Sequence, residues 1–132
     1  MASLARSNGA SGAYFEISGE VANNSTWQEI IYFMEAGSPM VLTGLSFKMT
    51  FRADGDSDSA DYTLSTDDST LTVQADADSG IANNLYINVA AGSLSALRGD
   101  YVCDLASEDG NGAVQPWGHG VVSFRPNPVS FS

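Results

Sequence analysis

Hydrophobic and polar residues alternate strictly in one segment of the chain, residues 45–52, which read LSFKMTFR. Leucine, phenylalanine and methionine occupy every second position, and serine, lysine, threonine and arginine occupy the positions between them. A period of two residues is that of a β-strand with one face in the core and one face in water. The pattern therefore predicts a half-buried strand here.

Weaker alternation, or clusters of β-branched and aromatic residues, recurs along the rest of the chain. These segments are residues 14–17, 27–34, 62–65, 71–73, 85–89, 101–105 and 121–124. Clusters of Gly, Asp, Asn, Ser and Pro separate them at the spacing of an antiparallel sandwich. Residues 90–97 (AAGSLSAL) can form at most one helical turn, because glycine and serine disfavour a longer helix. The sequence predicts an all-β fold: an antiparallel β-sandwich, Ig-like or jelly-roll-like, of about eight short strands.

The length of 132 residues, with 43% hydrophobic content, suits one domain with one core. Residues 1–12 are rich in small and polar side chains, so we expect a flexible N-terminal arm followed by a single domain over residues 13–132. The N-terminus has no apolar segment of signal-peptide length, and no apolar run approaches membrane-spanning size. We therefore expect no standard export signal.

Sixteen acidic and five basic residues give the chain a net charge of −11. The basic residues are scattered and form no stripe or patch. Nucleic acids and anionic membranes both require clustered cations. Neither is expected to be a partner.

Candidate catalytic and metal-binding residues are few. Cys103 and His119 are the only cysteine and histidine, so there is no internal disulfide and no Cys/His cluster for zinc. Cys103 shares its alternation with core positions, which predicts a buried, unreactive thiol. Gly118 and Gly120 flank His119 and suggest a β-bulge or close backbone packing. Without a Gly-x-Ser-x-Gly elbow or a phosphate-binding glycine loop, we expect no catalytic residues, no cofactor and no enzyme.

An acidic segment, residues 53–61 (ADGDSDSAD), invites comparison with an EF-hand calcium loop. Its first three aspartates fit positions 1, 3 and 5, but Ser59 falls where glycine is required and Ser65 where glutamate is required. We predict a hairpin loop between two strands. The alternative is a weak cation site, unlike an EF-hand, within residues 54–61.

Residues 30–34 (IIYFM) are apolar on both faces of their predicted strand. Such a strand requires cover from another segment or another subunit. Exposed aromatic residues could alternatively line a sugar-binding face, although most are needed to fill a small core. The candidate assembly contacts are Leu4, Arg6, Tyr14, Phe15, Ile30 and Tyr32.

Several short motifs follow one another in a recognisable order. They are GSP at 37–39, VLTG at 41–44, F-x-M-x-x-R at 47–52, LST at 64–66, I-x-V at 87–89, L-x-G-x-Y-x-x-D-L at 97–105 and GVV at 120–122. From residue 27 to about residue 124 this order resembles a small β-sandwich module of tailed-bacteriophage virion proteins. Val41 stands where that module usually has aspartate, and Cys103 where an aromatic is frequent; neither difference affects the expected fold.

The resemblance implies a non-enzymatic structural subunit of a phage virion, at the tail tip, baseplate or fibre attachment, with capsid decoration as the alternative. It implies other virion proteins and copies of the same chain as partners, assembly in the host cytoplasm, and no catalytic residues. A carbohydrate- or ligand-binding module is a more distant alternative. At the motif positions, Gly44 and Gly99 suit tight turns, and Tyr101, followed by Asp104, suits a corner with its ring in the core and its hydroxyl bonded to backbone.

Overall fold

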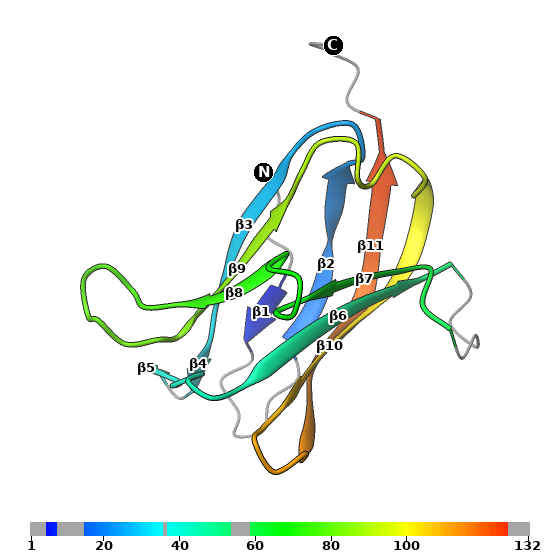
Figure 1. The fold of residues 1–132 in the computed structure, drawn as a ribbon. Coiled ribbons are helices and arrows are strands. Elements are labelled where there is room, and N and C mark those ends of the chain that lie inside the picture. The colour runs from blue at the N-terminus through cyan, green and yellow to red at the C-terminus, as the bar shows by residue number, and fades with distance from the viewer. Residues whose placement is uncertain (1–4, 8–14, 36, 54–58, 127–132) are drawn as a thin grey trace.

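The structure, a computed structural model, describes residues 5–7, 15–35, 37–53 and 59–126. This part of the chain is built almost entirely from strands and turns (Figure 1). The strands are β1 (Ala5–Ser7), β2 (Phe15–Ala22), β3 (Trp27–Tyr32), β4 (Met34–Glu35), β5 (Ser38–Pro39), β6 (Ser46–Arg52), β7 (Tyr62–Ser65), β8 (Leu71–Gln74), β9 (Asn84–Val89), β10 (Gly99–Glu108) and β11 (Val114–Arg125). Within these ranges no helix is long and apolar enough to cross a membrane.

Two sheets face one another across the core, which confirms the predicted all-β sandwich (Figure 1). The larger has the order β1-β2-β11-β10-β6-β7 and the smaller has the order β3-β9-β8. A short hairpin of β4 and β5 continues from the end of β3. Residues 91–96 form successive turns, with the amide of Leu97 donating to the carbonyl of Leu94, so the expected limit of one helical turn holds.

One pair of strands departs from the antiparallel arrangement. β2 and β11 run parallel, with Gly120 opposite Ile17 and Phe124 opposite Val21. Hairpin turns oblige consecutive strands to run antiparallel, but β2 and β11 lie near opposite ends of the chain and no turn connects them. Their relative direction is therefore set by packing in the assembled sheet.

The strict alternation of residues 45–52 appears directly in the burial of β6. Phe47, Met49 and Phe51 are completely buried, whereas Ser46 and Lys48 are exposed. The core joins these side chains to apolar residues of the smaller sheet, including Ile31 and Leu85. Burial of such apolar surface supplies the main favourable term in folding.

Aromatic rings fill the centre of the sandwich, as expected for a core of this size. Phe124 meets Phe51 and Tyr101 edge to face, with ring centroids 5.3 and 5.5 Å apart. Phe33 meets Trp117 in the same way at 5.2 Å. Edge-to-face contacts of this kind add to the gain from burial alone. The two aromatic residues of β3 divide between this core and the outer surface, since Trp27 is buried and Tyr32 stays 53% exposed.

The motif positions have the local roles expected of them. Gly44 and Gly99 have φ angles of 85° and 88°, which a glycine adopts without strain. The ring of Tyr101 is buried, and its hydroxyl accepts a hydrogen bond from the backbone amide of Arg98 at 3.4 Å. The predicted tyrosine corner is confirmed in its ring and hydroxyl. Asp104 has a separate role on the outer surface of the sheet.

Candidate functional site

The outer surface of the larger sheet carries most of the charged side chains described for the strands. We call it the charged face, and its ionisable residues are Glu16, Glu20, Lys48, Arg52, Asp100, Asp104, Glu108, His119 and Arg125. They occupy the alternate positions of β2, β6, β10 and β11, opposite the buried ones. This face therefore follows from the same period of two residues that builds the core.

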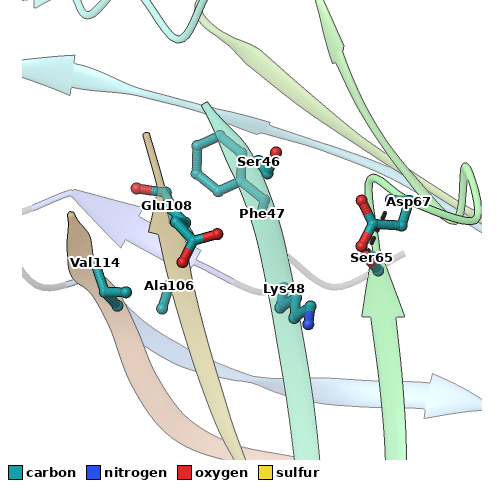
Figure 2. A pocket seen from close by; sticks show the side chains of 9 residues that line it. Ser46, Phe47, Lys48, Ser65, Asp67, Ala106, Glu108 and Val114 are labelled. Carbon is teal, nitrogen blue, oxygen red and sulfur yellow. Dashed lines mark hydrogen bonds between the residues drawn. The ribbon is translucent and has the colours of Figure 1, made fainter. Parts of the chain in front are cut away.

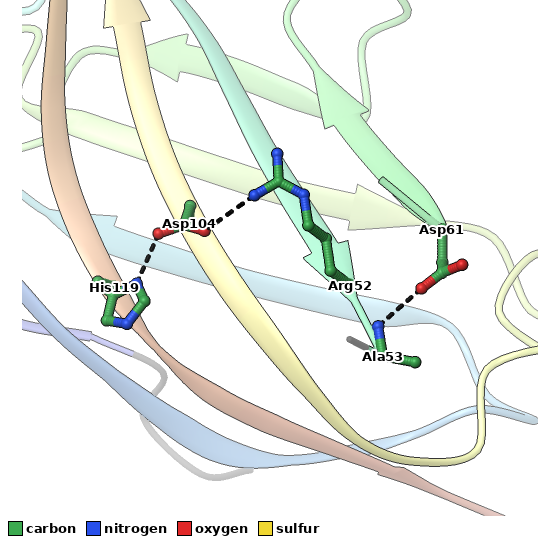
Figure 3. A network of polar contacts seen from close by, with 5 residues as sticks. All are labelled: Arg52, Ala53, Asp61, Asp104 and His119. Atoms are coloured by element: carbon green, nitrogen blue, oxygen red, sulfur yellow. Dashed lines mark hydrogen bonds and ion pairs between the residues drawn. The ribbon is translucent and has the colours of Figure 1, made fainter. Parts of the chain in front are cut away.

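Three of these side chains form a chain of polar contacts across three neighbouring strands (Figure 3). His119 Nδ1 lies 2.6 Å from Asp104 Oδ1, and Arg52 Nη1 lies 3.6 Å from Asp104 Oδ2. The side chains are 62% (His119), 39% (Asp104) and 27% (Arg52) exposed. Because water and salt screen exposed pairs, each contact stabilises the fold by only about 0–1 kcal/mol.

A β-bulge positions His119 on this face. Leu105 pairs with Gly118, whereas the next residue of β10 pairs with Pro116, so Trp117 is the extra residue. Its side chain is buried, and its indole Nε1 donates to Ser107 Oγ at 2.7 Å. The bulge that the glycines around His119 predicted is confirmed, because it turns the tryptophan inward and the histidine outward.

The second glycine beside His119 marks a close backbone approach, which was the other prediction for this segment. A Cβ atom added to Gly120 would lie 1.7 Å from the carbonyl oxygen of Ile17 on β2. No side chain fits at that distance, so glycine is required where β11 meets its parallel neighbour. Both expectations for the Trp117-to-Gly120 segment are therefore met.

The Asp104–His119 pair has the orientation that a carboxylate gives to a catalytic imidazole, with Nδ1 toward the acid. A triad also needs a nucleophile beside the other ring nitrogen. Among the described residues, the hydrogen-bond partner of the ring is Asp104, and Glu16 is its neighbour in register on β2. In the described part of the chain, the hydrogen bond of the His119 ring therefore goes to an acid, and neither ring nitrogen is hydrogen-bonded to a hydroxyl or a thiol.

A hollow of about 290 Å³ lies at one end of the charged face (Figure 2). Lys48, Asp67 and Glu108 line it, and the amide of Asp67 donates to the hydroxyl of Ser65 at 3.0 Å. This volume is at the lower limit of small-molecule pockets. Its mixture of one cation and two carboxylates could accept a single polar group, such as a side chain of a partner.

The outer surface of the smaller sheet has a different composition. We call it the neutral face, and its residues are Gln28, Ile30, Tyr32, Thr72, Gln74, Tyr86 and Asn88. None of them is an Asp, Glu, Lys, Arg or His. Ile30 lies directly opposite Tyr86, and Gln28 Nε2 donates to Asn88 Oδ1 at 3.3 Å. This lack of charge stands out in a chain with a net charge of −11.

The structure places two of the expected assembly contacts on this neutral face. Ile30 is 39% exposed and Tyr32 is 53% exposed. Arg6 lies on β1 and Phe15 on β2, both in the larger sheet. These two candidate contacts are therefore on a different sheet from Ile30 and Tyr32. Leu4 and Tyr14 lie outside the described residues.

Sequence reasoning did not include Gln28, Tyr86 and Asn88 among the candidate contacts. Tyr86 and Asn88 alternate with the buried residues of β9, so the period-two pattern of residues 85–89 contains the signal that assigns them to the outer surface. The pairing of β9 with β3, which brings Tyr86 beside Ile30, has no such signal. It depends on contacts between segments far apart in the chain.

The acidic loop falls mostly outside the described residues, which omit 54–58. At its base, the Asp61 carboxylate accepts a hydrogen bond from the amide of Ala53 at 2.7 Å, which closes the loop between β6 and β7 (Figure 3). Among the residues that are described, no three His, Cys, Asp or Glu side chains gather as they would around a metal ion. The predicted hairpin connection is confirmed, since β6 and β7 pair antiparallel.

Cys103 lies in the core between the two sheets and is completely buried. Burial, together with the neighbouring Asp104 carboxylate, raises the pKa of the Cys103 thiol far above its usual range. A thiol of this kind carries almost no thiolate at neutral pH. The prediction of a buried, unreactive cysteine is confirmed in its burial.

Comparison with known proteins adds no family to this description. No protein-family model and no curated protein matches the chain.

Proposed function

We propose that this chain is a non-enzymatic structural subunit of a tailed-bacteriophage virion, at the tail tip, baseplate or fibre attachment. Decoration of the capsid is the alternative position in the particle. The proposal joins the motif order of the sequence to the chemistry of the two outer faces. Its partners are other virion proteins and further copies of the chain.

The motif positions support the proposal because they have structural roles. Gly44 and Gly99 form turns with positive φ, Tyr101 makes the corner, and Phe47 and Met49 lie in the core. These five positions of the likeness to the virion module build the body of the domain, whereas two others, Arg52 and Asp104, lie on the charged face.

The observation that carries the proposal is the contrast between the two outer faces of one small body. The charged face presents Arg52, Asp104 and His119, and the neutral face presents Ile30 and Tyr32. A subunit in an ordered assembly must contact different neighbours, and two chemically distinct faces supply two distinguishable contacts. Exposed Ile and Tyr without charged neighbours are typical of the centre of a protein interface.

Particle composition tests this function directly. Phage particles from a culture that encodes the chain are purified by density gradient, and their proteins are quantified by mass spectrometry. We expect the chain at a fixed stoichiometry, and immunogold labelling should place it on the tail. Labelling on the head would support the capsid alternative, and absence from intact particles would refute both.

One observation favours a second function, binding of a neutral glycan. The exposed Tyr32 and the half-buried Tyr86 contribute aromatic rings to this face, and Gln28 and Asn88 offer amide donors and acceptors to sugar hydroxyls. A glycan array with the purified chain tests it, with Tyr86→Ala as the variant that should lose any signal. No response from the wild-type chain at high concentration would exclude this function.

A further inference from the structure

We infer that the neutral face, centred on Ile30, Tyr32 and Tyr86, is the surface through which two copies of this chain contact each other. The inference names a partner for the subunit proposed above and in that sense rests on the proposed function. Its evidence is independent of the motif order, because it comes from exposure, charge and strand register.

The neutral face leaves large hydrophobic side chains exposed to solvent. Ile30 and Tyr32 are among the few large hydrophobic side chains that the described chain leaves exposed. They point outward from β3, while Trp27 and Ile31 of the same strand are buried in the core. Tyr86, which is half-buried, lies opposite Ile30 on β9, so the apolar part of this face extends from one strand to the next. Contiguous surface of this kind marks an interaction site more strongly than single exposed residues do.

The absence of charge on this face favours a second copy of the chain as the partner. Two molecules that each carry −11 repel one another, and the repulsion is greatest where their acidic residues would meet. The neutral face is the sheet surface on which no acidic residue would meet its own copy. A contact between two neutral faces therefore avoids the main electrostatic cost of self-association.

The charged face is a weaker candidate for the same contact. Arg52 is already paired with Asp104, and Arg125 Nε lies 3.8 Å from Glu20 Oε2. These cations have acidic partners within their own chain, so a second copy would have to compete with existing pairs. That face is better suited to a different, more basic neighbour.

The side chains of the neutral face are also able to pair with the same side chains of a second copy. A two-fold contact brings the same patch from both copies together, so every group must suit its own kind. Amide side chains and tyrosine hydroxyls each carry a donor and an acceptor and can therefore pair with themselves. Gln28 and Asn88 lie at one end of the apolar centre and Gln74 lies on β8, and all three satisfy this requirement, whereas a rim of one charge would not.

Sedimentation velocity of the full chain tests the inference, from about 5 μM to about 500 μM. We expect the weight-average sedimentation coefficient to rise with concentration. Salt should strengthen the association, because it screens the repulsion between two acidic chains. The apparent dissociation constant should fall about threefold or more between about 50 mM and about 500 mM NaCl.

Charge added to the face should abolish the contact. Tyr32→Lys and Gln28→Lys each place two like charges together in the contact and should weaken association about tenfold or more. Gln28 is exposed and polar, so its variant tests the face without changing the core. Val121→Lys is the matched control, because Val121 is 48% exposed on β11 in the charged face and should leave association unchanged. Circular dichroism and a melting curve confirm that each variant is folded.

The opposite results are equally clear. A wild-type chain that stays monomeric at every concentration and at both salt levels overturns the inference, as does equal weakening by all three lysine variants. If the wild type stays monomeric but binds a neutral oligosaccharide that Tyr32→Lys no longer binds, the face belongs to a glycan and the inference is wrong. Presence of the monomeric chain in phage particles would leave the proposed function standing, so the two failures can be told apart.

Discussion

Asp104 and His119 lie directly opposite each other on β10 and β11, with Oδ1 and Nδ1 2.6 Å apart. The two residues are 15 positions apart in the chain. The bulge at Trp117 sets this register, because it shifts the pairing of β11 by one residue before His119. A local irregularity in one strand thus decides which acid the only histidine meets.

Replacing the shared acid of this network should have little effect on stability. Asp104→Asn removes the carboxylate that contacts both Arg52 and His119, but all three side chains are partly exposed. We expect the free energy of unfolding to fall by about 0–1 kcal/mol, measured by urea denaturation at neutral pH. Glu108→Gln removes the same charge from the same strand and serves as the control. A loss of several kcal/mol in Asp104→Asn alone would show that the network is structural.

Gly120→Ala should disrupt the parallel pairing of β11 with β2. The added methyl group would lie 1.7 Å from the Ile17 carbonyl oxygen, so the two strands must move apart. Overpacking of a well-packed site costs about 1–3 kcal/mol, and movement of backbone places this variant at the upper end. Thermal unfolding followed by circular dichroism measures the loss. Gly110→Ala is the matched control, since a Cβ atom there meets nothing within 4 Å, and an equal effect of the two variants would contradict the proposed cause.

Cys103 should react with a thiol reagent only when the chain unfolds. Its side chain is completely buried, and burial raises the pKa of the Cys103 thiol, so both access and thiolate are lacking in the folded state. We expect no reaction with Ellman's reagent over hours at neutral pH and complete reaction in guanidinium chloride. Cys103→Ser places a hydroxyl in the same apolar site and should cost about 1–3 kcal/mol, more than Cys103→Ala. Rapid modification of the native chain would contradict this burial.

The turn between β7 and β8 should make stability depend on acid pH. Hydrogen bonds from the Thr70 hydroxyl, at 2.6 Å, and from its amide, at 3.0 Å, lower the pKa of the Asp68 carboxyl. The folded state therefore binds this proton less readily than the unfolded chain does. The Asp68 carboxylate therefore adds to the free energy of unfolding above the unfolded-state pKa of about 4. This stabilisation is lost as the pH falls through the lower pKa of the folded state.

Asp68→Asn tests this pH dependence through melting temperatures between about pH 2 and about pH 7. The variant should be less stable than the wild type at neutral pH, and the difference should shrink as the pH falls. Asp67→Asn removes the neighbouring charge in the same turn and serves as the control variant. A gap between wild type and Asp68→Asn that stays constant with pH would rule out titration of this carboxyl as the cause.

The sequence by itself determined which side chains point inward and where the chain turns. Phe47, Met49 and Phe51 alternate with polar residues, and this period of two residues is a property of the strand backbone. The bulge beside His119 and the burial of Cys103 could also be predicted, because glycine spacing and alternation are local signals. The corner at Tyr101 was expected from its place in the motif order.

Only the tertiary structure decided which strands are neighbours where no hairpin turn joins them. The parallel pairing of β2 with β11, the meeting of Arg52, Asp104 and His119, and the continuity of Ile30 with Tyr86 all join segments distant in the chain. Alternation assigns a residue to a face but carries no information about the strand beside it or the register between them. Strand neighbours and their register are set when the two sheets bury their apolar sides together. The neutral face, which joins residues of β3, β8 and β9, could therefore be recognised only in the folded chain.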